Sequence, residues 1–320
     1  MASKPFASSA DLGDKKETLE ILADGVYAFT AEGDPNVCAI EAEDFIIAFE
    51  ARATPKAAND WLKELRKHTQ KPIKYLVLSH YHAVRVLGAS AFNADAIIAH
   101  DNTRVLIEER GIQDWDSEFG RMPRLFREPE GIPGLTKPDI TFNDKLVIPL
   151  GGDRGDLVLE YCGRGHTAGD IVAWIPKHKI LFAGDLVEAA AALYTGDAFH
   201  FDWATKTLDK VKAYRAETLV GGRGAVARGL EDVDAAIEQT RGFLEGMIEK
   251  VGEVHKRGGT VKEAFEETRD LLAPKFGMWP IFEHCLPFDV QRLWDECDGI
   301  DWPRIWTDER DQEVWDKLQD

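Results

Sequence analysis

The sequence predicts an α/β fold in which two layers of β-strands lie between outer layers of helices. Short apolar runs separated by turn residues come first, helical patterns follow, and the same order recurs in the second half of the chain. The 320 residues, 44% of them hydrophobic, are enough for one large domain with an extension. We therefore expect a four-layer αββα sandwich with a helical C-terminal extension.

The first half of the chain is predicted to contain a strand meander, two helices and two further strands. Thr54 is placed to cap a helix that reaches about His68, and Pro55 lies in its first turn. A second helix is expected from Asp101 to about Arg110, and residues 111–139 are expected to be irregular and to cover a site. Apolar runs bounded by turn residues predict strands at 19–22, 26–30, 37–40, 45–49, 73–78 and 96–99.

The second half repeats the pattern and ends in helices. Its strands are expected at 140–142, 146–150, 157–162, 171–175, 180–182 and 218–220, and its helices at 203–215, 229–252 and 261–274. These elements divide the chain into a loose N-terminal leader at 1–16, a sandwich domain at 17–228 and a helical extension at 229–320. The extension is expected to pack on the domain or on the partner of a homodimer.

Composition narrows the classes of function. A net charge of −18 disfavours nucleic acid and anionic membranes as partners, although a local basic pocket could still take an anionic small-molecule substrate. The four cysteines form no CxxC motif and are expected to be free thiols. No apolar run approaches the roughly 20 residues of a membrane span, and the first residues lack the apolar core of a secretory signal. We expect a soluble, cytoplasmic protein.

Four polar side chains stand just beyond the ends of predicted strands. His80 and His82 follow the strand at 73–78, and because strand side chains repeat with period two they reach the same side. His166 and Asp185 follow two later strands and are flanked by glycines, which let the backbone turn sharply. Three imidazoles and a carboxylate are a ligand set for zinc, iron or manganese.

The ordered motifs His80-Tyr81-His82, Gly165-His166-Thr167 and Gly184-Asp185 resemble those of the metallo-β-lactamase superfamily, in particular its glyoxalase II-like hydrolase branch. The resemblance covers roughly residues 17–228. It implies an αββα sandwich with one or two metal ions at the edge between the sheets. It also implies hydrolysis by a metal-bound hydroxide.

Three positions depart from the pattern of that superfamily. Val84 and Arg85 stand where its first motif carries Asp and His, and Arg223 stands in the place of its last metal-binding histidine. Valine and guanidinium cannot ligate a metal, so the resemblance predicts that the second metal is lost. Either arginine could instead hold a substrate anion or form an ion pair with Asp185 or Glu50. One metal site is predicted from His80, His82, His166 and Asp185.

These residues predict a mononuclear metal-dependent hydrolase acting on an ester, thioester, lactone or related small substrate. Asp185, Arg85 and Arg223 are the predicted catalytic residues, and one divalent ion is the predicted cofactor, zinc first, with iron and manganese as alternatives. Two other functions stay open. One is a non-haem iron dioxygenase of the persulfide dioxygenase type, and the other is a binding or sensor protein without catalysis.

Overall fold

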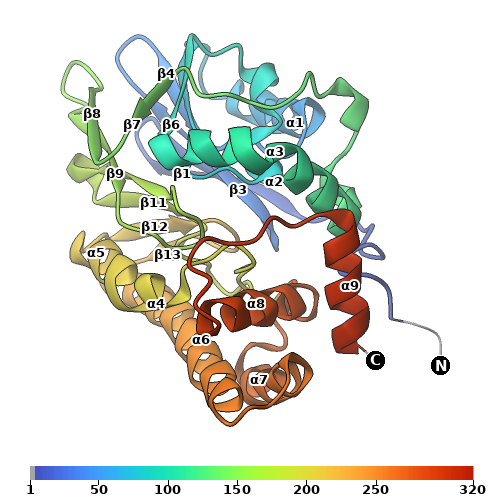
Figure 1. The fold of residues 1–320 in the computed structure, drawn as a ribbon. Coiled ribbons are helices and arrows are strands. Elements are labelled where there is room, and N and C mark those ends of the chain that lie inside the picture. The colour runs from blue at the N-terminus through green and yellow to red at the C-terminus, as the bar shows by residue number, and fades with distance from the viewer. Residues whose placement is uncertain (1–3, 320) are drawn as a thin grey trace.

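The computed structural model describes residues 4–319, and in it two β-sheets pack face to face with helices outside both (Figure 1). The first sheet has seven strands that pair in chain order. They are β1 (Glu17–Ala23), β2 (Val26–Ala31), β3 (Asp34–Glu41), β4 (Ile46–Phe49), β5 (Ile73–Val77), β6 (Ala96–His100) and β7 (Ile140–Phe142).

The second sheet has six strands in the order β13-β12-β11-β10-β9-β8. Its strands are β8 (Lys145–Pro149), β9 (Asp156–Tyr161), β10 (Ile171–Ile175), β11 (Ile180–Gly184), β12 (Thr218–Gly221) and β13 (Ala227–Arg228). The α-helices of the described chain are α1 (Pro55–Leu65), α2 (Ala83–Val86), α3 (Asp101–Arg121), α4 (His200–Asp202), α5 (Leu208–Ala213), α6 (Leu230–Lys256), α7 (Val261–Phe276), α8 (Phe282–Cys297) and α9 (Asp308–Gln319). The predicted four-layer fold is confirmed.

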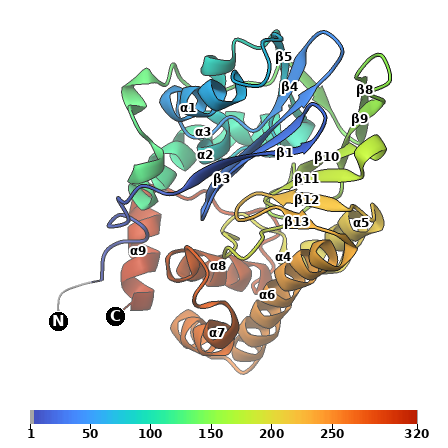
Figure 2. The same cartoon turned by 180° about the vertical axis from the view of Figure 1, so that it is seen from behind.

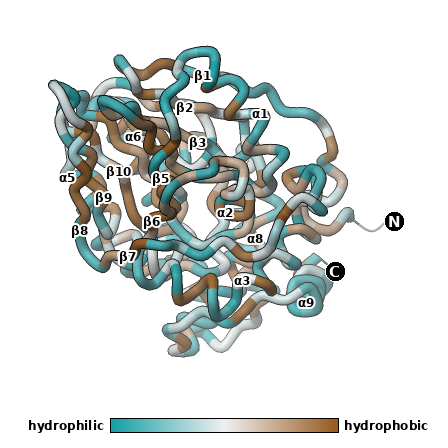
Figure 3. Tube along the Cα trace, turned by 90° about the horizontal axis from the view of Figure 1, so that it is seen from above, coloured by the Kyte–Doolittle hydropathy of each residue, from teal (hydrophilic) through white to brown (hydrophobic). Residues whose placement is uncertain are grey.

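Alternating side chains explain why both sheets are covered on two faces. In β4, Ile47 and Phe49 pack between the sheets, while Ile46 and Ala48 pack towards the helical layer that contains α1. Strand β11 alternates in the same way between the central layer and the C-terminal helices. The tube in Figure 3 is accordingly hydrophobic along β6, β9 and β10 and mainly hydrophilic along α9.

The C-terminal helices lie against the outer face of the second sheet (Figures 1 and 2). Leu181 of β11, Phe243 of α6 and Phe288 of α8 belong to one buried apolar cluster. The N-terminal segment is also packed, since Ala7 is buried and the Ser8 amide donates to the carbonyl of Arg121 at 3.0 Å. Every helix within residues 4–319 is too short or too polar to cross a bilayer.

Helix α1 confirms its predicted start, but helix α3 corrects the prediction for residues 111–139. The Thr54 hydroxyl accepts the amide of Ala57, as an N-cap does. Helix α3 does not end near Arg110 but continues to Arg121. Its last three turns bury polar side chains such as Glu118, so apolar periodicity could not reveal them.

Candidate metal centre

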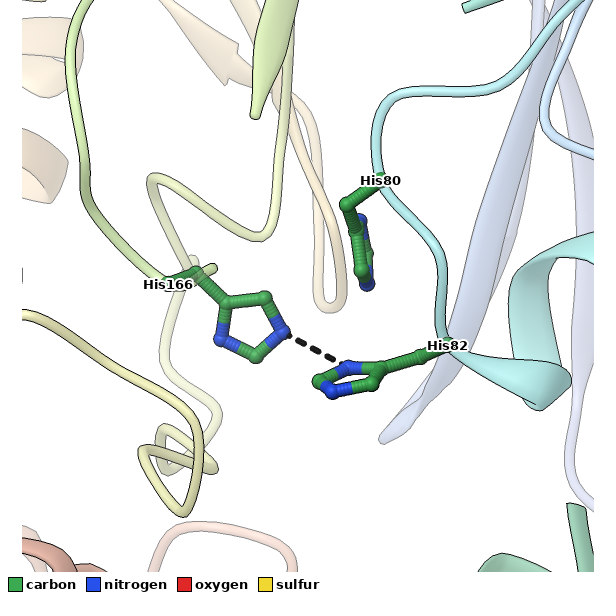
Figure 4. A group of neighbouring side chains, drawn as sticks. All are labelled: His80, His82 and His166. Atoms are coloured by element: carbon green, nitrogen blue, oxygen red, sulfur yellow. Dashed lines mark hydrogen bonds between the residues drawn. The ribbon is translucent and has the colours of Figure 1, made fainter. Parts of the chain in front are cut away.

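Three histidines converge at the edge between the two sheets (Figure 4). His80 and His82 come from the loop between β5 and α2, and His166 comes from the loop after β9 on the opposite side. Their ring nitrogens all lie within 4.8 Å of one another, and the three residues are at most 2% exposed. The structure thus brings together the three residues that the sequence motifs predicted as metal ligands.

The donor atoms fit a small cation. Nδ1 of His82 lies 3.0 Å from Nε2 of His166, and Nε2 of His80 is buried with no hydrogen-bond partner among the described residues. A tetrahedral zinc with bonds of about 2.0–2.1 Å holds its nitrogens roughly 3.3 Å apart. Burial lowers the pKa of His80 and lowers that of His166 to about 3. Both rings are therefore neutral, which is the form that ligates metals.

A buried carboxylate orients His82. Nε2 of His82 lies 3.3 Å from Asp197, whose other oxygen accepts a bond from Arg110 at 3.3 Å. Burial lowers the pKa of His82, but Asp114, Asp197 and Glu118 outweigh it and raise the pKa to about 9. The His82 ring must therefore release its Nδ1 proton when it ligates a metal. With Nε2 directed at Asp197, the Nδ1 atom faces the other histidines. Sequence reasoning missed Asp197, because no local pattern marks it.

The fourth predicted ligand, Asp185, lies beside the three histidines and is ion-paired. Its Oδ2 atom is 3.5 Å from Nε2 of His166 and 3.8 Å from Nε2 of His80. Its Oδ1 atom accepts a close bond from Arg85, and its Oδ2 atom lies 3.1 Å from Arg223. Burial alone would raise the pKa of Asp185, but Arg85, His80 and Arg223 hold it well below the usual range.

The two arginines fill the side of the site next to Asp185. Arg85 is completely buried and also donates to the carbonyls of Asn36 at 3.2 Å and Gly222 at 2.9 Å. Arg223 also pairs with the buried Glu188 at 3.1 Å, a partner that the sequence reasoning did not identify. The expected ion pair with Asp185 is thus present, whereas a substrate contact of either arginine stays a prediction.

Val84 and Glu50 make contacts within the protein, by apolar packing and by a hydrogen bond respectively. Val84 is 1% exposed and packs in the apolar cluster beneath the first sheet. Glu50 accepts the amide of Ser79 at 3.2 Å. Burial raises the pKa of Glu50 to about 7, although Arg85 acts in the opposite direction.

Two face-to-face sheets with three buried histidines at their edge are the arrangement that the sequence motifs predicted. A family model described as "Metallo-beta-lactamase superfamily" matches residues 52–223, which is more than half of the chain. The chain therefore belongs to the metallo-β-lactamase superfamily. Its place in the glyoxalase II-like branch stays a prediction.

Curated relatives are distant and are matched in part. A metallo-beta-lactamase type 2 from Bacillus sp. (strain 170) is 29% identical over 177 residues, covering 53% of this chain and 59% of the relative. A linear primary-alkylsulfatase from Pseudomonas sp. (strain ATCC 19151) is 22% identical over 268 residues, covering 72% of this chain and 49% of the relative. The chain thus spans about half to three fifths of the length of these two relatives.

Solved structures support the fold. DIM-1 metallo-beta-lactamase matches with a TM-score of 0.54 and 18% identity, covering 72% of this chain and 97% of that chain. A metallo-beta-lactamase from Pontibacter korlensis matches with a TM-score of 0.57 and 18% identity, covering 72% and 99%. At this identity the likeness concerns the fold and not the activity.

Proposed function

We propose that this protein is a metal-dependent hydrolase that binds one divalent cation, zinc first among the alternatives, on His80, His82 and His166. The observation that carries the proposal is the convergence of three buried ring nitrogens, one of them without any other partner among the described residues. Membership of the superfamily supports hydrolysis as the reaction.

We assign the transfer of a proton to Asp185. A bound divalent cation would supply Lewis acidity and would lower the pKa of a coordinated water. The Oδ2 atom of Asp185, 3.5 Å from His166 Nε2, lies close enough to the triad to accept a hydrogen bond or a proton from a water molecule there. Arg85 and Arg223 keep this carboxylate ionised and therefore able to accept a hydrogen bond.

The arginines favour one cation over two. Arg85 and Arg223 both contact Asp185, on the side where the superfamily pattern would place a second metal. A guanidinium is always charged and has no lone pair to donate, so it repels a metal and cannot bind it. Together they bring the positive charge that a second cation would otherwise supply.

The proposed substrates are small esters, thioesters and lactones. The linear primary-alkylsulfatase among the relatives adds sulfate esters to the panel that should be tested. Purified protein should hold one equivalent of metal, measured by plasma mass spectrometry, and should hydrolyse at least one member of this panel. Tightly held iron with oxygen consumption would instead favour the dioxygenase alternative.

The matched variants His80→Ala and His178→Ala test the site directly. His80→Ala removes a donor of the triad, so we expect loss of metal and of activity. His178 lies in the turn between β10 and β11, so His178→Ala should keep both. Full metal content in a folded His80→Ala variant would show that the assignment is wrong.

A second candidate function is binding or sensing without catalysis. The observation that favours it is burial, because the triad, Asp185, Arg85 and Arg223 are at most 3% exposed. Both oxygens of Asp185 are also paired with arginines. Metal binding without turnover of any substrate in the panel would favour this candidate over the hydrolase.

A further inference from the structure

A separate cavity of about 270 Å³ is lined in part by the chain segments that carry Arg85 and Asn36. Its lining includes Val84 and Pro35, the residues immediately before those two. The remaining walls come from the N-terminal segment, the start of β1, the loop after β4, the start of α1 and the segment after α3. The cavity therefore neighbours the metal centre without containing any of its histidines.

Basic side chains outnumber acidic ones in this lining. Four basic residues and three acidic residues face the cavity, in a chain whose net charge is −18. Arg124 holds Asp34 through two bonds of 2.5 and 2.7 Å, so this carboxylate is neutralised. Lys15 and Arg127 stand at the more exposed parts of the wall, where they pair with Asp11 at 3.0 Å and Asp60 at 3.4 Å. Each cation of the lining thus has an acidic partner, and an anion would depend on the donors of Arg52 that remain unpaired.

Arg52 is a cation of the cavity lining that keeps unpaired hydrogen-bond donors within the described chain. It is 5% exposed, and its Nη1 atom pairs with Glu17 at 2.9 Å. Its Nε and Nη2 atoms are buried and have no hydrogen-bond partner among residues 4–319. A guanidinium offers five donors, and leaving several unmet in a buried place is costly. The Phe29 ring covers one face of this guanidinium, with its centroid 4.9 Å from Cζ, but the N–H groups of Nε and Nη2 still lack an acceptor among the described residues.

The loop that carries Arg52 is strained and is tied to the metal centre. Glu50 and Arg52 adopt φ values of 71° and 62°, the left-handed region that side chains other than glycine rarely enter. The amide of Ala51, between them, donates to the carbonyl of Arg85 at 2.8 Å. Strain of this kind persists where the surrounding structure holds a functional geometry.

We propose that this cavity binds an oxyanion, a sulfate, phosphate or carboxylate group, with Arg52 as its anchor. Glu17, the first residue of β1 and itself part of the lining, occupies one donor of Arg52 in the absence of the ligand. A bidentate grip by guanidinium suits all three anionic groups. The inference concerns this cavity alone and does not depend on hydrolysis or on a metal.

Calorimetric titration of the full chain tests the proposal. Sulfate, phosphate and succinate are titrated separately at constant ionic strength set with chloride, and at least one should bind saturably. The titrant that binds most tightly indicates whether the natural ligand is an inorganic anion or an organic carboxylate. Arg52→Met removes the guanidinium that lies over the Phe29 ring and keeps an unbranched apolar side chain, so it should weaken binding at least tenfold. Arg269→Met, an exposed arginine of α7, should leave it unchanged.

The variant Glu17→Gln should strengthen anion binding, whereas Arg52→Met should weaken it. The amide oxygen of Gln can still accept from Arg52, but the negative charge that competes with the anion is removed, so the same anion should bind at least threefold tighter. This variant decides the matter if Arg52→Met does not fold, as judged by circular dichroism. The proposal fails if no anion binds saturably, if folded Arg52→Met binds as well as the unaltered protein, or if Glu17→Gln binds no tighter.

Discussion

At the scale of single residues, the candidate centre depends on charges held in fixed pairs. Asp185 is surrounded by Arg85 and Arg223, and Arg223 is itself balanced by Glu188. Gly222 permits this closeness, because a Cβ atom there would overlap Asp185 and lie 2.7 Å from the guanidinium of Arg85. Any side chain at this position would therefore separate the ion pair.

Asp197 should act as a positioning residue for the metal ligand His82. Removing it frees the His82 ring to rotate and to change tautomer. We expect Asp197→Ala to weaken metal affinity about 10–100-fold, measured by competition with a chelator. Asp209→Ala, which alters an exposed carboxylate that pairs with Arg241, is the control and should bind normally. If Asp197→Ala binds metal as tightly as the unaltered protein, Asp197 does not position His82.

The arginine replacement can be reversed in one variant. Val84→Asp, Arg85→His and Arg223→His together put ligating side chains where the superfamily pattern has them. We expect the stoichiometry to rise from one metal to two, measured by mass spectrometry of the native protein. A folded triple variant that still binds one metal would count against the idea that the arginines replaced the second ion.

At the scale of elements, helix α3 organises the loop of the two histidines. Asp114 accepts the amide of Ala83, and Glu118 accepts the amide of Val84, each at 2.7 Å. These bonds satisfy two free amides at the start of the short helix α2. The polar buried face of α3 thus has a structural purpose, which is why it does not follow an apolar pattern.

Gly88 is the point where the segment after α2 meets the loop after β4. A Cβ atom there would overlap the carbonyl oxygen of Ala51 and lie 2.8 Å from that of Thr54, and backbone cannot easily move away. We expect Gly88→Ala to cost more than about 2 kcal/mol of the free energy of unfolding, measured with urea. Gly252→Ala, in α6 with nothing within 4 Å, should instead stabilise by about 0.5–1 kcal/mol. If Gly88→Ala lowers the free energy of unfolding by less than about 2 kcal/mol, the backbone of the loop after β4 can move away from the added methyl group.

At the scale of the whole molecule, the C-terminal helices and the second sheet share one apolar cluster. Phe288 of α8 is completely buried and packs against Trp306, Trp315 and Phe6. Arg292, also on α8, donates to the carbonyl of Ala198 at 2.8 Å, next to Asp197 of the metal centre. The helices are therefore coupled to the site by packing and by hydrogen bonds.

This sharing predicts a single unfolding transition for the full chain. Phe288→Ala should cost about 3–5 kcal/mol and lower the midpoint of that one transition, measured by scanning calorimetry. Phe201→Ala removes an aromatic side chain that is 46% exposed, and it should change little. Two separate transitions, with only one moved by Phe288→Ala, would show that the helices unfold on their own.

Local patterns in the sequence determined the four layers, the Thr54 cap and the positions of His80, His82 and His166 at strand ends. Each depends on neighbours within a few residues, such as strand alternation or a glycine beside a histidine. The polar turns of α3, the support of His82 by Asp197, and the pairing of Arg223 with Glu188 were decided by the tertiary structure. So was the cavity around Arg52. Those features join side chains from separate elements, and an ion pair or a cavity exists only after packing has brought its partners together.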